Sequence, residues 1–450
     1  MPSYRSLALA VLGALTLALP ARADVPAPPV DPAVAAAIAR ISADELRATD
    51  ERLVAFGTRS TFSEKSTDPK RGVFAARAYL VDRFRQIARS SGGRLTVALD
   101  SYTQAADPAK RVPREVVISS VVATLKGDDP AAPTYVMSSH YDSRNSDNDD
   151  GEHDAPGADD NGSAVSAVLE AARVLTPLHF HGTIIFACFD AEEQGLFGSG
   201  HFAQTLKAAN VDVEGDLNND IMGASVGDDG VKRDGYVRIF SEALPAGATL
   251  ARVNTIGAQN DSPSNELARF TKETGDAYGL GLTGMLVFRA DRFLRGGDHE
   301  SFNAAGFPAL RFTEPRETFA HQHQNVRVEN GVQYGDLIRF MDFDYLAKVA
   351  RYNVASLAAL AAAPAAPSAE ILTAALANDT TLRWQPVPGA VRYEVVRRLT
   401  TEPQWTHVDD AGAKTTITLP YSKDQWQFGV RSVDAQGHRS LATYPSPVRA

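Results

Sequence analysis

The chain has 450 residues, of which 44% are hydrophobic and 22% are charged, the proportions of an ordinary globular protein. This length exceeds what a single hydrophobic core usually serves, so two or three domains are expected. The formal net charge of −10 argues against nucleic acid as a partner. The one cysteine, Cys188, excludes an intramolecular disulfide framework and is interpreted as a small buried hydrophobe.

Residues 1–23 have the pattern of a secretory signal peptide. Arg5 supplies the positive charge, residues 7–19 are almost wholly apolar, and Ala21-Arg22-Ala23 is a typical cleavage site. The apolar run is too short to span a membrane, and no later stretch is long and apolar enough to do so. The sequence therefore predicts a secreted or periplasmic protein without a membrane span.

Residues 24–362 are predicted to form one α/β domain in which strands and helices alternate. Helical periodicity predicts helices at 42–55, 72–88, 161–175, 198–209, 264–275 and 335–362. Apolar runs predict strands at 95–102, 116–125, 183–189, 236–240, 286–288 and 309–312, with one strand before His140 and one ending near Asp220. Repeated strand–helix units indicate a mixed, largely parallel central sheet that is flanked by helices.

Residues 363–368 are rich in alanine and proline and are predicted to be a linker. Residues 369–450 contain short alternating strands separated by turns, which is typical of a small β-sandwich. The Leu-x-Trp and Tyr-x-Val patterns that begin at Leu382 and Tyr393 resemble a fibronectin type III domain. Such modules are common accessories, so no catalytic role is assigned to it. Contact with a surface or polymer is its expected use.

Three predicted strands are followed by residues that bind metals. His140 follows the first strand, Glu192-Glu193 follow the strand at 183–189, and Asp220 lies at the end of the next strand. Ligand-binding groups gather at the carboxyl ends of neighbouring strands in an open α/β sheet. Asp142 stands two residues after His140, where its carboxylate can accept the other ring N–H and fix the tautomer. The sequence therefore predicts a metal site.

The adjacent carboxylates of Glu192 and Glu193 point to hydrolytic chemistry. Two such groups at a buried strand end repel each other unless a cation or a proton intervenes. In the productive arrangement one binds metal and its neighbour, with a raised pKa, acts as general base. Imidazole and carboxylate ligands match Zn²⁺, and two such ions can activate a shared water and polarise a peptide carbonyl.

Five motifs, in this order, resemble those of the co-catalytic zinc aminopeptidase family. They are His140-Tyr141-Asp142-Ser143, Gly157-Ala158-Asp159-Asp160-Asn161-Gly162-Ser163, Glu192-Glu193-Gln194-Gly195, Asn219-Asp220-Ile221-Met222-Gly223 and Gly297-Asp298-His299-Glu300-Ser301-Phe302. That family contains secreted bacterial leucyl-type aminopeptidases and, more distantly, glutamate carboxypeptidases and glutaminyl cyclases. The resemblance covers about residues 41–362. It implies a zinc-exopeptidase fold, two zinc ions, and peptide or protein substrates with a free N-terminus.

The resemblance also implies roles for individual residues. His140 and Asp220 resemble the ligands of one zinc ion, and Glu193 with a late histidine resembles the ligands of the other. Asp159 would bridge both ions, and Glu192 would be the general base. The peptide bond after Asp159 is expected to be cis.

The remaining assignments concern supporting residues and the late histidine. Asp142 matches the carboxylate that lies behind the first histidine ligand and supports it. Asp160 is also assigned to the residues that support the metal ligands. Asp298 either supports the ligands or lines the substrate-binding site. His323 is the choice for the late ligand, because it precedes a polar turn that leads to the final helix, and His321 stays an alternative.

Other readings stay open. The acidic loop at 146–151 has some features of a calcium loop, but Gly157 stands where an EF-hand needs glutamate, which leaves only an irregular Ca²⁺ site. The family resemblance also admits a carboxypeptidase or a glutaminyl cyclase. A non-catalytic, metal-dependent binding protein would require a lost general base, whereas Glu192 is present.

Overall fold

The computed structural model describes residues 25–244, 262–373 and 376–449, and the predicted signal peptide lies outside these ranges. The helices are α1 Pro32–Ile38, α2 Ala43–Val54, α3 Val73–Ala88, α4 Ala164–Leu175, α5 Phe197–Ala208, α7 Pro263–Ala277, α8 His299–Ala305 and α9 Phe343–Ala362. The strands are β1 Leu95–Gln104, β2 Val116–Leu125, β3 Thr134–His140, β4 Thr183–Phe189, β5 Val213–Asn219, β6 Tyr236–Ser241, β7 Thr283–Phe288, β8 Ala309–Thr313, β9 Arg327–Glu329, β10 Val332–Tyr334, β11 Ala369–Leu372, β12 Thr380–Trp384, β13 Arg392–Leu399, β14 His407–Gly412, β15 Thr416–Leu419, β16 Trp426–Val433 and β17 Ser446–Val448.

Over the described residues, the main sheet has eight strands in the order β1-β2-β4-β3-β5-β8-β6-β7. The pairings of β4 with β3, β3 with β5, β5 with β8 and β6 with β7 are parallel, and the other three are antiparallel. The predicted mixed, largely parallel sheet is therefore confirmed. Because β4, β3, β5 and β8 are neighbours and parallel, their carboxyl ends meet at one edge of the sheet.

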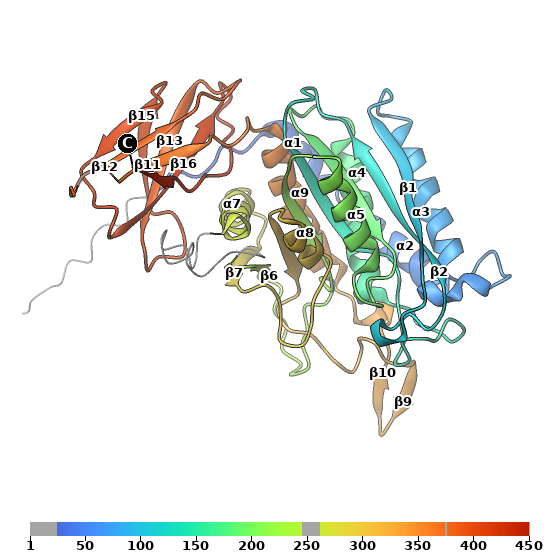
Figure 1. Cartoon of the computed structure of the whole chain (residues 1–450). Helices are drawn as coiled ribbons and strands as arrows, with labels where there is room; N and C mark the ends of the chain where they lie inside the picture. The colour runs from blue at the N-terminus through green and yellow to red at the C-terminus, as the bar shows by residue number, and fades with distance from the viewer. Residues whose placement is uncertain (1–24, 245–261, 374–375, 450) are drawn as a thin grey trace, which may run out of the picture.

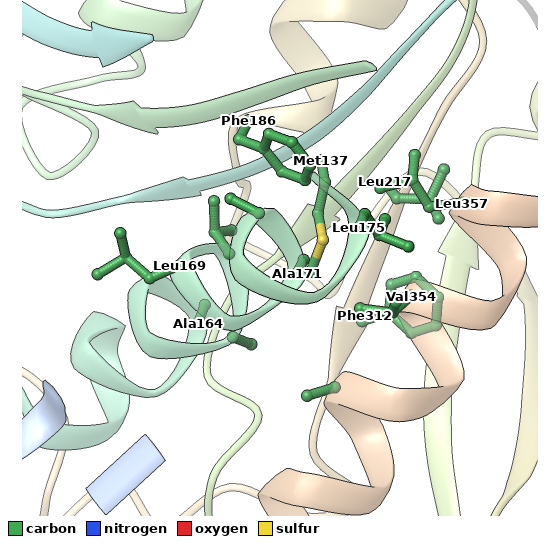
Figure 2. Close-up of a cluster of buried hydrophobic side chains, with 14 of the residues drawn as sticks. Met137, Ala164, Leu169, Ala171, Leu175, Phe186, Leu217, Phe312, Val354 and Leu357 are labelled. Atoms are coloured by element: carbon green, nitrogen blue, oxygen red, sulfur yellow. The ribbon is translucent and has the colours of Figure 1, made fainter. Parts of the chain in front are cut away.

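Side chains that alternate along β4 divide the core between the two faces of the sheet. Ile184, Phe186 and Cys188 face a large apolar cluster that includes residues of α1, α2, α3, α4 and α9. The intervening residues of β4 face a smaller cluster with α5 and α8. This alternation follows the two-residue period of a strand, so helices cover both faces. Figure 2 shows part of the first cluster, where Met137 and Phe186 of the sheet lie over α4 near Ala171.

Burial of Cys188 in this cluster raises the pKa of its thiol to about 12, which agrees with its interpretation as a small hydrophobe. No helix in the described part of the chain is long and apolar enough to cross a bilayer.

The final helix begins later than the periodicity predicts. The sequence predicts a helix from 335 to 362, whereas α9 starts at Phe343. Gly335 has a φ of 105°, which a right-handed helix excludes, and β9 and β10 form a hairpin just before it. The carboxylate of Asp342 accepts the backbone N–H of Tyr345 at 3.1 Å and caps the helix at this point.

Beyond Ala362, where α9 ends, the chain forms two small sheets, ordered β15-β12-β11-β17 and β14-β13-β16. Apolar residues of both sheets share one core, which includes Leu382, Trp384, Val395 and Phe428. The two sheets thus pack face to face, as a sandwich does.

The sandwich packs on the α/β domain through α7, which lies between the two parts in Figure 1. The indole N–H of Trp405 donates to the carboxylate of Glu266 at 2.9 Å, and the backbone N–H of Ala442 donates to the other oxygen at 3.1 Å. Arg269 of the same helix donates to the carbonyl oxygen of Pro403 at 2.6 Å. Buried polar contacts therefore cross the boundary between the two parts.

Candidate metal centre

The centre lies where the central parallel strands end. His140 is the last residue of β3, and Phe189, the last residue of β4, pairs with it. Glu192 and Glu193 follow in the next turn, and Asp220 comes directly after β5. The strand pattern in the sequence predicts this meeting point, because neighbouring parallel strands deliver their following residues to the same edge.

Two groups of donor atoms face each other at this edge. His140, Glu192 and Asp220 form the first group, and Asp160, Glu193 and His323 form the second. Within each group the ligand atoms all lie within 4.8 Å of one another.

Asp160 connects the two groups. Its Oδ1 lies 3.2 Å from Nε2 of His140, and its Oδ2 lies 2.8 Å from Nε2 of His323. A carboxylate placed in this way offers one oxygen to each side. The short helical turn Ala158–Ser163 makes this possible, because Asp160 leaves helical geometry within it, with φ −107° and ψ 87°.

The predicted position of Asp159 between the two groups is wrong in this structure, as is the assignment of Asp160 to a supporting layer. Asp159 points away from the two groups: its Oδ1 accepts the backbone N–H of Gly223 at 2.7 Å, and its carboxyl contacts Glu314. The cis peptide bond also lies one residue later than expected, between Asp160 and Asn161. The break in helical geometry at Asp160 turns its side chain to the centre, whereas Asp159 faces Gly223 and Glu314.

The carboxyls behind Asp160 form a buried support. Burial raises the pKa of Asp159 to about 6 and the pKa of Glu314 well above its ordinary value, so a proton between the two carboxyls is favoured. The carboxylate of Asp336 accepts the backbone N–H of Asp159 at 2.9 Å and that of Asp160 at 2.7 Å. These contacts hold the turn that presents the Asp160 carboxylate.

Asp142 lies behind the first group, as the sequence predicts. Nδ1 of His140 is 3.1 Å from the carbonyl oxygen of Asp142 and 3.5 Å from its Oδ1. The carboxylate oxygens of Asp142 also accept the backbone N–H groups of Glu192 and Glu193, each at 3.2 Å. Asp142 therefore orients the histidine, mainly through its carbonyl oxygen, and both glutamates through its carboxylate.

Glu192 is the most accessible member of the first group. Its side chain is 12% exposed, compared with 1% for His140 and 5% for Asp220. Burial raises the pKa of Glu192 well above its ordinary value; the charge of His140 opposes the shift, and the carboxylates of Asp220 and Glu193 add to it. A carboxylate with a raised pKa at the opening of the centre is suited to accept and return a proton.

The structure places His323, and not His321, beside the second group. Nε2 of His323 lies 3.1 Å from Oε2 of Glu193. The ring of His321 stacks on Phe340 instead, with 3.6 Å between the ring centroids, and burial lowers its pKa to about 4. The alternative left open by the sequence is therefore not favoured by the geometry.

Several buried donor atoms of the centre lack protein partners. Oε1 of Glu193 and Oδ1 of Asp220 are buried and make no hydrogen bond within the described residues. Nε2 of His140 is buried opposite carboxylate oxygens, of which Oδ1 of Asp160 is the nearest at 3.2 Å. Such atoms are costly to bury unless a ligand satisfies them. Imidazole nitrogens and carboxylate oxygens are ligands that Zn²⁺ accepts. The residues present therefore fit zinc.

Two buried arginines support the centre and carry no signal in the sequence. Nη2 of Arg311 lies 3.1 Å from Oδ2 of Asp220 and leaves Oδ1 free to face the centre. Arg59 donates to the carbonyl oxygens of Tyr141 and Gly157, at 2.7 and 2.8 Å, which joins the end of β3 to the turn that carries Asp160. Arginine is rarely buried, so neither position stands out in the sequence.

Asp298 lies behind the centre and not at its opening, because it is completely buried. Burial raises its pKa to about 7, the charge of His140 opposes that shift, and Asp220 adds to it. The alternative that Asp298 forms part of the substrate wall is not supported by this position.

A third cluster of metal-binding residue types, Asp291, His299 and Glu300, is an ion-pair network. Asp291 pairs with Arg311 and Arg292, each at 2.9 Å, and Nε2 of His299 lies 2.7 Å from the carbonyl oxygen of Ala290. The positive charges of Arg311 and Arg292 already offset the carboxylates of Asp291 and Glu300, so this place does not favour a cation.

Two donor groups that share a carboxylate, with a further glutamate at their opening, form the arrangement of a metal-dependent hydrolase. Residues 120–340 match peptidase family M28. The chain is 45% identical over 420 residues to a "Probable zinc metalloprotease" of Leptosphaeria maculans, covering 92% of this chain and 97% of the relative. A "Probable zinc metalloprotease" of Pyricularia oryzae is 44% identical over 424 residues, covering 92% and 84%. The chain therefore belongs to peptidase family M28 and is related to zinc metalloproteases.

Solved structures agree on the fold. The LapA aminopeptidase of Legionella pneumophila matches with a TM-score of 0.52 and 21% identity, over 74% of this chain and 76% of that one. The glutaminyl cyclase of Macrostomum lignano matches with a TM-score of 0.52 and 14% identity, over 73% and 92%. At these identities the likeness supports the fold and does not choose between the two activities.

Proposed function

We propose that this protein is an aminopeptidase that binds two zinc ions and removes the N-terminal residue from peptides or proteins. The observation that carries the proposal is the position of Asp160, whose two oxygens face His140 and His323 at 3.2 and 2.8 Å. A carboxylate shared between two donor groups is what a pair of neighbouring ions requires.

From the first group, His140 and Asp220 would hold one ion together with Asp160, whose Oδ1 faces His140, and Glu192 would stay free of the metal. Asp160, Glu193 and His323 would hold the other ion. Zinc bound at this centre would act as a Lewis acid on the peptide carbonyl and lower the pKa of a bound water. Glu192 would take the proton of the attacking water and deliver it to the leaving amine. The raised pKa of Glu192 and its exposure at the opening favour both steps.

A free N-terminal amine has a possible partner at this centre. The carboxyl groups of Asp160, Glu193 and Asp220 would be balanced by the two zinc ions, whereas Glu192 is not assigned to either ion. Its carboxylate lies at the opening of the centre, where it can accept a hydrogen bond from the amine of a substrate. The substrate test below separates aminopeptidase from carboxypeptidase activity.

The test compares leucyl-p-nitroanilide with its N-acetyl derivative. We expect cleavage of the first and almost none of the second, because acetylation removes the free amine and adds bulk to the N-terminus of the substrate. Comparable kcat/KM values for both would contradict the aminopeptidase proposal. Release of a C-terminal residue would identify the carboxypeptidase alternative, and cyclisation of an N-terminal glutamine would identify the glutaminyl cyclase alternative.

We also propose that the protein is exported, with a signal peptide cut after Ala23, and that residues 369–450 are a fibronectin type III-like module. Determination of the N-terminal residue of the mature protein tests the export proposal, and we expect Asp24. A mature protein that begins at Met1 would contradict it.

A further inference from the structure

The two histidines of the centre have opposite hydrogen-bond settings. Nδ1 of His140 faces an acceptor, the carbonyl oxygen of Asp142, at 3.1 Å. This contact places the ring proton on Nδ1 and leaves a lone pair on Nε2. In this tautomer the lone pair of Nε2 faces Oδ1 of Asp160 at 3.2 Å, two acceptors that a cation between them would satisfy.

His323 has the reverse setting. Its Nδ1 lies 2.6 Å from Nη2 of Arg144. A guanidinium group only donates, so Nδ1 is the acceptor, and the proton of a neutral ring is then on Nε2. That nitrogen faces Oδ2 of Asp160 at 2.8 Å and Oε2 of Glu193 at 3.1 Å. The nitrogen that points at the metal position therefore carries the proton.

The same guanidinium also holds a carboxylate of this group. Nε of Arg144 lies 2.9 Å from Oε2 of Glu193, and the arginine side chain is only 15% exposed. The two loops are joined nearby, because Ser146 donates its N–H and its hydroxyl to Oδ1 of Asn325 at 3.1 and 2.8 Å. Arg144 is thus held against two residues of the second group.

We propose that Arg144 is a positioning residue that makes the Asp160–Glu193–His323 group bind its metal ion more weakly than the His140–Asp160–Asp220 group. A metal ion bound to Nε2 of His323 would require the ring proton to be on Nδ1. The N–H of Nδ1 and the N–H of Arg144 would then face each other, with no acceptor between them. The guanidinium must therefore leave Nδ1 before the ion binds.

The first group differs in this respect. Arg311 contacts Oδ2 of Asp220 and leaves Oδ1 without a hydrogen bond, much as Arg144 leaves Oε1 of Glu193. The difference lies at the histidine, because Nδ1 of His140 faces the carbonyl oxygen of Asp142 and not a guanidinium group. The first group is consequently filled at a lower zinc concentration, and the second is filled as Arg144 withdraws. This inference rests on the proposed two-ion centre.

The test titrates zinc chloride into the metal-free full-length protein by calorimetry with a competing chelator. We expect two binding steps in the wild type and a weaker step that tightens about 10–100-fold in Arg144→Gln, the range typical of changes behind a metal ligand. The glutamine side chain removes the charge and offers an amide oxygen to Nδ1. The Arg144→Met variant removes the charge alone and serves if the glutamine variant does not fold.

Two further variants separate this role from a general effect of charge or packing. Arg144→Lys keeps a cation that only donates, so its weaker step should stay within a few-fold of the wild type. Arg111→Gln removes a charge that hydrogen-bonds to the backbone oxygen of Glu193 at 3.2 Å and not to its carboxylate, and it should leave both steps unchanged.

The inference is overturned if Arg144→Gln leaves the weaker step unchanged, or if Arg144→Lys or Arg111→Gln tightens that step equally.

The number of bound ions separates this inference from the proposed function. If the wild type binds two ions and Arg144→Gln binds them with unchanged affinity, the inference fails and the proposed function stands. One ion in the wild type and two in the glutamine variant would support the inference, whereas one ion in both would remove the inference and the two-ion centre together.

Discussion

The carboxylate of Asp160 lies 2.8 Å from the imidazole of His323, although the two residues belong to loops far apart in the sequence. Its other oxygen faces His140 at 3.2 Å. We therefore expect Asp160→Asn to lose zinc from both positions, because an amide offers one weaker donor where a carboxylate serves two ions. Metal analysis after dialysis measures this loss.

Asp159→Asn is the matched control, since it makes the same chemical change one residue earlier, where the side chain faces Gly223 and Glu314. We expect this variant to retain both ions. Greater zinc loss from Asp159→Asn than from Asp160→Asn would restore the assignment predicted from the sequence.

Glu192→Gln should keep the metals and the fold but lose turnover. The side chain is the most exposed of its group and would act on the proton of the attacking water, and general bases contribute on the order of 10²–10⁴-fold. A kcat close to that of the wild type would exclude Glu192 as the base. Glu193→Gln is the comparison, because it should lower the zinc content as well as the rate.

The sequence predicts most of this centre because its signals are local. His140 ends a recognisable buried strand, Glu193 and Asp220 come soon after two others, and parallel strands bring such residues to one edge. The sequence could not tell Asp159 from Asp160, because the choice depends on a single backbone turn at Asp160 that neither composition nor periodicity records.

The supporting arginines were not predictable for a different reason. Arg144 and Arg311 act through contacts with residues distant in the sequence, and a single arginine in a loop or strand is usually exposed. The same limit applies to the C-terminal sandwich: the composition of residues 363–368 predicts a linker, but it does not show the buried contacts with α7.

Those contacts predict that the sandwich stabilises the α/β domain. Trp405→Phe removes a buried donor to Glu266 and should lower the free energy of unfolding by about 1–3 kcal/mol beyond the loss of volume. Urea denaturation measures the effect. Trp384→Phe is the control, because this buried indole N–H makes no hydrogen bond within the described residues. Equal effects of the two substitutions would exclude a role for the Trp405 contact.

The interface should also make stability depend on pH. Burial raises the pKa of Glu266 to about 7, although the positive charge of Arg269 acts to lower it. The folded state keeps this proton up to about pH 7, whereas the unfolded state loses it near the ordinary value of 4.5, so rising pH between these values lowers stability. The full shift corresponds to about 3 kcal/mol.

Glu266→Gln should therefore flatten the decline in unfolding free energy between about pH 4.5 and 7, compared with the wild type at the same zinc concentration. Urea unfolding at a series of pH values checks this. An identical slope in both proteins would show that Glu266 does not titrate in this range.

The most direct test of the account is the anomalous scattering of zinc in crystals of the zinc-loaded protein. We predict two peaks, each about 2.0–2.2 Å from a different carboxylate oxygen of Asp160, with His140 beside one and His323 beside the other. A single peak, or two peaks bridged by Asp159, would contradict it.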